Sequence, residues 1–239
     1  MKSMPRLITA MVTPFKEDFS VDFEGAQKLA LQLIEEGSDG LVISGTTGES
    51  PTLSVPEKMD LFKAIKEAVG DKGYLIAGTG TNSTADCLKL TEGATKIGVD
   101  AVMVVVPYYN KPNAEGLYRH YKAAASVTDL PMILYNVPGR TGINMSPETV
   151  ARLSQIPNIV AVKEASGNLD QVSAIRNLVP RDFLIYSGDD SLTLPIMAVG
   201  GYGVISVASH VAAPQIREMI MSFVNGDVQR AAEIHGKLF

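Results

Sequence analysis

The chain contains a single cysteine, Cys87, among its 239 residues. One thiol cannot form an internal disulfide, and it excludes a metal site built from several cysteines. The chain also has no excess of positive charge, since 21 Lys and Arg residues stand against 26 Asp and Glu residues and the formal net charge is −5. Nucleic acid is therefore not expected as the main partner, because phosphate binding needs a concentrated basic face.

Long apolar runs and linkers are also missing. No stretch approaches the ~18 consecutive apolar residues of a membrane helix. The short apolar run at residues 7–12 leads into TPFKED without a small-residue cleavage site, which favours a strand over a signal peptide. We therefore expect a cytoplasmic protein with no membrane partner. No Ser/Pro-rich segment or charge block divides the chain, and 46% hydrophobic residues are enough for one core.

Eight short apolar runs alternate with segments of helical periodicity. Several runs are apolar on both faces, as is typical of strands in a parallel sheet covered by helices. Eight such repeats predict an α/β fold, a (β/α)₈ TIM barrel over residues 1–226. A doubly wound open sheet is the alternative, because periodicity cannot prove closure. Residues 227–239 begin one further helix. The expected strands cover residues 7–12, 41–44, 74–77, 101–106, 132–135, 159–163, 183–187 and 204–207.

In such a barrel, the loop after each strand is where chemistry is expected. After the second strand, GTTGES places the hydroxyls of Thr46 and Thr47 between glycines. Backbone N–H groups and hydroxyls there suit a carboxylate or a phosphate, although such clusters are more often plain loops. After the third strand, AGTGTN lacks the third glycine of a dinucleotide fingerprint. It predicts a turn and a helix cap, without a nicotinamide cofactor.

Phenols and an arginine follow the next two strands. In PYYNKP, Tyr108 and Tyr109 cannot both face the same way in an extended chain. A packed aromatic plug and a phenol that enters a site both stay open. Tyr135 ends the fifth strand, and Arg140 follows on a glycine-flanked loop. Because the guanidinium fork suits bidentate carboxylate binding, a functional role is favoured for Arg140 over a solvated surface position.

Lys163 ends the sixth strand and is followed by Glu164. Burial at that end would disfavour the ammonium form, lower the pKa and make a nucleophilic amine available. A structural lysine paired with Glu164 is an equal alternative. After the seventh strand, Asp189 and Asp190 suggest a divalent metal, but no histidine or further acid clusters with them, so a loop or helix cap is favoured.

An amine, a phenol, hydroxyls and an arginine together are the parts for Schiff-base chemistry on an oxo-acid. The amine condenses with the ketone, and the iminium then withdraws electrons. Deprotonation of the adjacent methyl group gives an enamine nucleophile, with the phenol and hydroxyls moving protons.

Eight segments in order carry a resemblance that covers essentially the whole chain: VTPF, GTTGES, AGTGTN, PYYNKP, ILYNVPGRTG, VAVKEASGN, SGDD and GGYGVISV. The chain resembles the pyruvate-dependent class I aldolases of the dihydrodipicolinate synthase and N-acetylneuraminate lyase family. PYYNKP and GRTG favour the synthase branch, which condenses pyruvate with aspartate 4-semialdehyde and cyclises the product in lysine and diaminopimelate biosynthesis. Another pyruvate-dependent aldolase and a catalytically silent pyruvate-binding barrel remain alternatives. Members of the family continue past the eighth helix, so residues 227–239 would be the start of a truncated C-terminal helical segment.

The resemblance implies a role for each matching residue. Lys163 would form the imine with pyruvate, and Tyr135 would donate and accept protons. Thr46 would relay protons between Tyr135 and a Tyr109 supplied by a neighbouring subunit, which implies a homo-oligomer. No metal or organic cofactor is implied. The implied substrate-binding residues are Thr47, Arg140, Gly188 and Ile205.

Regulated members of this family bind lysine at a subunit contact, away from the imine. The positions here that match this effector site are Ser50, Pro51, Asn82, Asp86 and Tyr108. Val55 and Lys58 stand where lysine-sensitive members often carry histidines. Because valine offers no hydrogen bond and a lysine side chain repels a cationic ligand, we expect weak or absent inhibition by lysine.

Overall fold

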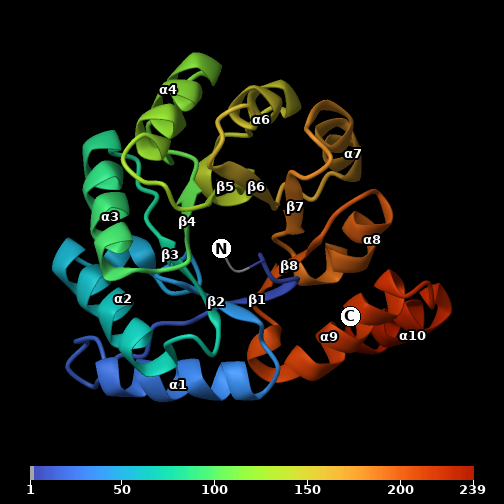
Figure 1. Ribbon diagram of the computed structural model, residues 1–239, viewed down its shortest axis with the longest axis horizontal. Helices are drawn as coiled ribbons and strands as arrows, with labels where there is room; N and C mark the ends of the chain where they lie inside the picture. Colours follow the sequence, from blue (N-terminus) through green and yellow to red (C-terminus); the bar gives the residue numbers. More distant parts are fainter. Residues whose placement is uncertain (1–2) are drawn as a thin grey trace.

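The structure is a computed structural model that describes residues 3–239. Its eight strands are parallel and close into a barrel, because β8 pairs with β1 as well as with β7. The helices form a ring around the strands (Figure 1). The predicted TIM barrel is thus confirmed, and the open-sheet alternative is wrong. The strands are β1 Leu7–Ala10, β2 Gly40–Ile43, β3 Tyr74–Gly78, β4 Ala101–Val105, β5 Met132–Asn136, β6 Ile159–Glu164, β7 Leu184–Ser187 and β8 Gly203–Ser206.

The helices begin and end at residues with matching local chemistry. Ser54 and Glu57 form a capping box at the start of α2, and the Ser146 side chain caps α6. Gly98 ends α3 with φ +85°, a left-handed conformation in which glycine is favoured. The helices are α1 Phe23–Glu35, η1 Ser50–Thr52, α2 Val55–Val69, α3 Thr84–Ile97, α4 Ala114–Ala125, α5 Pro138–Thr141, α6 Pro147–Leu153, α7 Leu169–Leu178, η2 Asp190–Leu192, α8 Thr193–Ala198, α9 Ser209–Val224 and α10 Val228–Leu238.

The barrel has two apolar layers, one inside the strands and one between strands and helices. Alternation along β5 divides them: Ile133 and Tyr135 pack inside, whereas Leu134 packs against the helices. The N-terminal end of the barrel is closed by the segment before β1, where the hydroxyls of Tyr186 and Tyr202 donate to backbone carbonyls of that segment at 2.7 and 2.9 Å. The opposite, carboxyl end therefore stays open for a site.

The C-terminal helices depart from one expectation. The sequence predicts a helix that opens at Ala213-Pro214, but α9 begins at Ser209, with a kink at Ala212 (φ −138°) just before the proline. Beyond it, α10 packs along α9 on the outer flank of the ring (Figure 1), where Ile234 is buried. Within residues 3–239, no helix combines the length and the apolar character needed to cross a bilayer.

Candidate active site

Lys163 and Tyr135 lie side by side at the carboxyl end of the barrel. The register of β5 and β6 pairs them directly, and alternation points both side chains into the barrel. The Lys163 Nζ atom is 4.4 Å from the centroid of the Tyr135 ring. The parallel pairing of two strands thus brings together an amine and a phenol that are 28 residues apart.

Burial alters the protonation of the Lys163 amine. The residue is only 4% exposed, and desolvation lowers the pKa of its ammonium to about 8, against the opposing effect of Asp190 and Asp189. At pH 7 about one amine in ten is then neutral, compared with about one in three thousand for an ordinary lysine. The alternative, a structural ion pair between Lys163 and Glu164, is wrong, because the Glu164 carboxylate lies on the outer face of β6 and bonds other partners there.

Tyr135 connects the amine to the loop after β2. Burial raises the pKa of its phenol, while a hydrogen bond with the Thr46 side chain and the positive charge of Arg140 act in the opposite direction. A phenol with such neighbours can give up and take back a proton within a fixed hydrogen-bond chain. Thr46, Tyr135 and Lys163 therefore form a line of side chains, joined by the Thr46–Tyr135 hydrogen bond and by the contact of the Lys163 amine with the Tyr135 ring.

A cavity of about 310 Å³ opens in front of this line. Its apolar wall comes from Met103 and Val105 of β4. The sequence does not predict these two residues as part of a site, because apolar strand residues carry no chemical signal. Only their positions four and two residues before the PYYNKP loop could have indicated it. Tyr135 lines the cavity, and the Lys163 amine lies next to the Tyr135 ring without lining the cavity itself. The lining residues are Ser44, Gly45, Thr46, Ser50, Pro51, Gly78, Gly80, Met103, Val105, Tyr108, Tyr135, Val137, Arg140 and Thr141.

Three further predicted substrate-binding residues do not line the cavity. Thr47 is half-buried next to Thr46, and Ile205 is fully buried inside the barrel on β8. Gly188 follows β7, and a Cβ atom there would stand 3.2 Å from Cε of Lys163. A glycine at this position leaves room for the lysine chain.

The side chains of the two adjacent tyrosines in PYYNKP point in different directions, as predicted. Tyr108 lines the cavity, whereas Tyr109 is 88% exposed and has a left-handed φ of +70°. A non-glycine residue rarely adopts this conformation, and such strain concentrates at functional sites. Within one chain, Tyr109 is therefore not part of the cavity.

Arg140 lines the cavity, but its local structure differs from the prediction. In place of the expected loop is the short helix α5, Pro138–Thr141, which is followed by its C-cap residue Gly142 with φ +71°. Proline at the first turn and a left-handed glycine after the last turn are the usual helix signals, and both are present here in a segment too short to show helical periodicity. The guanidinium is exposed, and its charge reaches both Tyr135 and Lys163.

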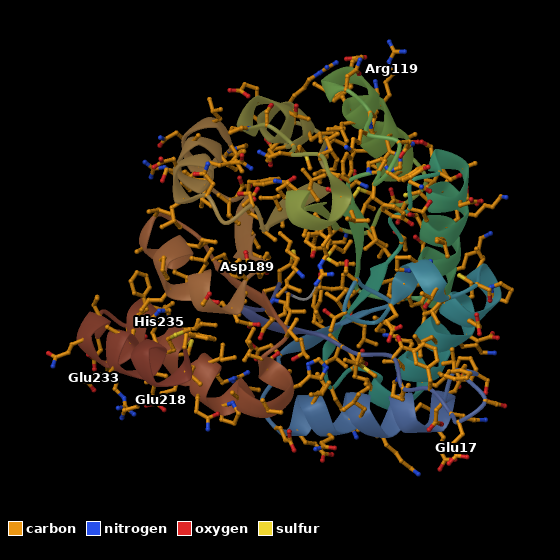
Figure 2. All side chains as sticks on the ribbon, turned by 180° about the vertical axis from the view of Figure 1, so that it is seen from behind. Glu17, Arg119, Asp189, Glu218, Glu233 and His235 are labelled. Atoms are coloured by element: carbon orange, nitrogen blue, oxygen red, sulfur yellow. The ribbon has the colours of Figure 1, made fainter. Side chains whose placement is uncertain are left out.

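Of the neighbouring Asp189 and Asp190, the second makes hydrogen bonds that stabilise the fold. Asp190 accepts hydrogen bonds from the Ser206 hydroxyl and from the backbone N–H groups of Val207 and Ala208, both at 3.0 Å, and so fixes the turn between β8 and α9. Asp189 lies inside the ring of helices (Figure 2). Asp189 is the N-cap residue of η2, but its side chain makes no capping hydrogen bond, and α9 has no side-chain cap either. Of the two predicted alternatives to a metal site, a loop and a helix cap, the loop is the one that the structure fits. In the described part of the chain, no three His, Cys, Asp or Glu side chains gather as a metal site would need.

The predicted lysine-effector residues do not form one separate group. Ser50, Pro51 and Tyr108 line the same cavity as Tyr135. Asn82 and Asp86 lie outside it at the start of α3, where the Asn110 amide donates to the Asn82 carbonyl at 3.1 Å.

Comparison with known proteins defines the family. Residues 3–239 match the Dihydrodipicolinate synthetase family. This chain is a member of that family. It is 63% identical to the 4-hydroxy-tetrahydrodipicolinate synthase of Dehalococcoides mccartyi over 238 residues, and 59% identical to that of Moorella thermoacetica over 234 residues. These alignments cover 100% and 98% of this chain and 80% of each relative.

Solved structures agree with this assignment. Dihydrodipicolinate synthase from Bacillus anthracis superposes with a TM-score of 0.96 at 48% identity, covering 100% of this chain and 82% of that one. The enzyme from Acinetobacter baumannii, which is chloride-inhibited and complexed with pyruvate, superposes with a TM-score of 0.94 at 41% identity, covering 98% and 81%. The enzyme from Cyanidioschyzon merolae, with lysine bound, gives a TM-score of 0.94 at 51% identity, covering 96% and 79%.

Proposed function

We propose that this protein is a 4-hydroxy-tetrahydrodipicolinate synthase that joins pyruvate to aspartate 4-semialdehyde through a Schiff base on Lys163. The observation that carries the proposal is the buried amine of Lys163, whose pKa is lowered to about 8 beside the Tyr135 ring. Family membership supplies the substrate class. Residues 1–226 would form the catalytic barrel, with 227–239 as the first part of a C-terminal helical segment.

The first half-reaction makes the nucleophile. The neutral amine attacks the ketone carbon of pyruvate, and loss of water gives a protonated imine. Tyr135 moves protons for this step and accepts one from the methyl group, so that the C–H electrons form an enamine. Thr46 hydrogen-bonds the phenol and passes protons onward. Thr47, Gly188 and the Ile205 backbone would hold pyruvate near Lys163.

The second half-reaction uses Arg140. Its guanidinium lines the cavity and would bind the carboxylate of the semialdehyde as a bidentate fork. The enamine carbon attacks the aldehyde carbon, and the aldehyde oxygen takes a proton. The amino group of the former semialdehyde then displaces Lys163 from the imine carbon, which closes the ring and frees the amine. This scheme uses neither a metal nor an organic cofactor.

Borohydride reduction tests the proposal. Incubation with pyruvate and borohydride, followed by intact-mass and peptide analysis, should show one reduced pyruvate adduct, on Lys163. Turnover with aspartate semialdehyde should then distinguish the enzyme from a barrel that only binds pyruvate. An adduct on another lysine, or none, contradicts the mechanism, and cleavage of sialic acid would assign the chain to the lyase branch.

Arg140→Ala should impair use of the semialdehyde while sparing the pyruvate imine. Loss of hydrogen bonds to a charged group costs about 1.5–3 kcal/mol, or roughly a 10- to 150-fold fall in kcat/KM for the acceptor. Arg140→Lys should recover little, because an ammonium lacks the fork. Arg119→Ala, at the outer edge of α4 (Figure 2), is the matched control. Equal losses in adduct formation and acceptor use would remove Arg140 from this role.

We expect the active form to be a homo-oligomer, at least a dimer, in which Tyr109 completes the neighbouring site. Its exposure in the single chain is consistent with a contact residue. Tyr109→Phe should lower turnover about 10- to 100-fold by removing a proton carrier, whereas Tyr118→Phe on α4 should not. Sedimentation and activity measured against protein concentration provide the check. A fully active monomer would rule out the shared site.

Inhibition by lysine should be weak. Val55 is 41% exposed and offers no hydrogen bond. Lys58 is buried, its pKa is lowered by desolvation, and the charge of Asp86 opposes that shift. A second ammonium near Asp86 would be repelled by Lys58. A lost charged hydrogen bond corresponds to roughly one to two powers of ten in affinity. Strong inhibition in a titration at low lysine concentration would show that other residues replace the missing histidines.

A further inference from the structure

A second polar cluster lies behind the reacting residues, on the outer face of β5 and β6. It consists of Asn136, Asn144, Glu164 and Gln171. Asn136 directly follows Tyr135 on β5, and Glu164 directly follows Lys163 on β6. The two are paired in register, and their side chains point away from the barrel axis toward α7. Asn136 is fully buried, and Glu164 is 1% exposed.

The Glu164 carboxylate binds three donors. Its Oε1 atom accepts from the Ser166 backbone N–H at 2.7 Å, and Oε2 accepts from the Gln171 amide at 3.1 Å. The Asn136 amide donates to both oxygens, at 3.2 and 3.0 Å. No lysine or arginine within residues 3–239 forms an ion pair with it. A buried charge without a counter-ion is costly, so these donors are what holds it there.

An ionised carboxylate only accepts hydrogen bonds, and this decides how the surrounding amides are oriented. Because the Asn136 Nδ2 faces Glu164, its Oδ1 is free to accept from the Met145 N–H at 2.9 Å. The same Nδ2 donates to Asn144 Oδ1 at 2.7 Å, and Asn144 and Gln171 form a two-way amide pair at 2.7 and 3.1 Å. The cluster thus ties β5 and β6 to the segment after α5, the helix that carries Arg140.

We propose that Glu164 is a positioning residue, whose acceptor-only carboxylate fixes β5, β6 and the α5 segment relative to one another and so holds Lys163, Tyr135 and Arg140 in the reacting arrangement. This inference rests on the proposed function. Figure 1 shows β5 and β6 adjacent in the barrel, with α6 and α7 outside them. A displacement of about 1 Å at reacting atoms can cost roughly a hundredfold in rate.

Glu164→Gln removes one acceptor with almost no change in volume. The new amide sets a donor against Asn136, Ser166 or Gln171. If the Asn136 amide turned so that its oxygen faced the new donor, its Nδ2 would face the Met145 N–H, and two donors would then oppose each other. Either orientation of Asn136 therefore loses one hydrogen bond. We expect the rate constant of pyruvate imine formation to fall about 10- to 100-fold and the pyruvate KM to rise, with the acid limb of the pH profile unmoved.

The matched control is Asn158→Ala, just before the other end of β6. The Asn158 amide donates to the carbonyls of Ala125 and Thr128 at 3.0 and 2.8 Å, far from the reacting end. Its loss should lower the thermal midpoint, as removal of a buried hydrogen-bond partner does in both variants, yet leave the imine rate constant within about twofold of wild type. A purely structural role for Glu164 would reduce the folded fraction only, leaving the rate constant per folded site and the pyruvate KM unchanged.

The experiment traps the imine with borohydride over time in the full chain, at several pyruvate concentrations and pH values, with folded protein quantified. A wild-type rate constant in Glu164→Gln would overturn the proposal, as would an equal loss in Asn158→Ala. A loss recovered by a shifted pH midpoint would also overturn it, since the carboxylate would then act through its charge. If Glu164→Gln fails to fold, Gln171→Ala removes one donor and must show an intermediate loss. A wild-type chain that forms no imine would instead refute the proposed function.

Discussion

Lys163→Met should abolish the borohydride-trapped pyruvate adduct and lower turnover by roughly a thousandfold or more. The methionine side chain fills the same volume but has no amine, so the covalent route is closed and only binding and proton transfer remain. Burial at the pairing of β5 and β6 lowers the pKa of this amine to about 8, which the proposed mechanism requires. Mass analysis of the reduced protein and a coupled assay with the semialdehyde measure the two losses.

Lys63→Met is the control for loss of a lysine charge. This residue is exposed on α2, outside the barrel. The control should keep the adduct and near-normal turnover. If Lys163→Met still formed an adduct, another lysine would be the nucleophile and the barrel would use a different strand end.

The barrel was predictable because apolar runs and helix signals agree along the chain. The expected strands differ from the observed ones by at most two residues at either end, as with residues 7–12 against β1 at Leu7–Ala10. Closure could not be predicted, because the β1–β8 pairing joins Leu7 to Val204 and leaves no local trace. The kink at Ala212 was also hidden, because the proline signal at 214 marks the start of the second part of α9 only.

The site was predictable in its residue types and less so in its arrangement. Lys163 and Tyr135 stood out as polar residues at the ends of apolar runs, but their direct pairing follows from the β5–β6 register alone. The sequence alone leaves Glu164 open as a salt-bridge partner of Lys163. Alternation along a strand separates neighbours to opposite faces, and the network that satisfies this carboxylate comes from Asn136 and Gln171, which no local pattern connects.

The charges around the amine act in opposite directions. Asp190 and Asp189 favour the ammonium, while burial and Arg140 disfavour it. Since Asp190 is held by the backbone N–H groups of Val207 and Ala208, just before α9, its distance from Lys163 is set by the fold. With a pKa of about 8, the amine is mostly protonated at pH 7 and about one tenth of it is neutral, which is the form that the proposed imine formation needs.

Lys163→Met should also stabilise the fold, in a manner that depends on pH. Lowering the pKa from 10.5 to about 8 means that the folded state carries a cost of about 3 kcal/mol for the buried ammonium below pH 8. Between pH 8 and 10.5 the folded protein has lost this proton and the unfolded chain has not, so wild-type stability rises with pH and the cost disappears. The free energy of unfolding should therefore favour the variant most at pH 7 and progressively less at pH 9 and above. Urea unfolding of both proteins across this range measures the difference, with Lys63→Met as the control. A difference that stayed constant with pH would show that the pKa of the Lys163 amine is not lowered in the folded protein. The proposed nucleophile would then not be activated at neutral pH.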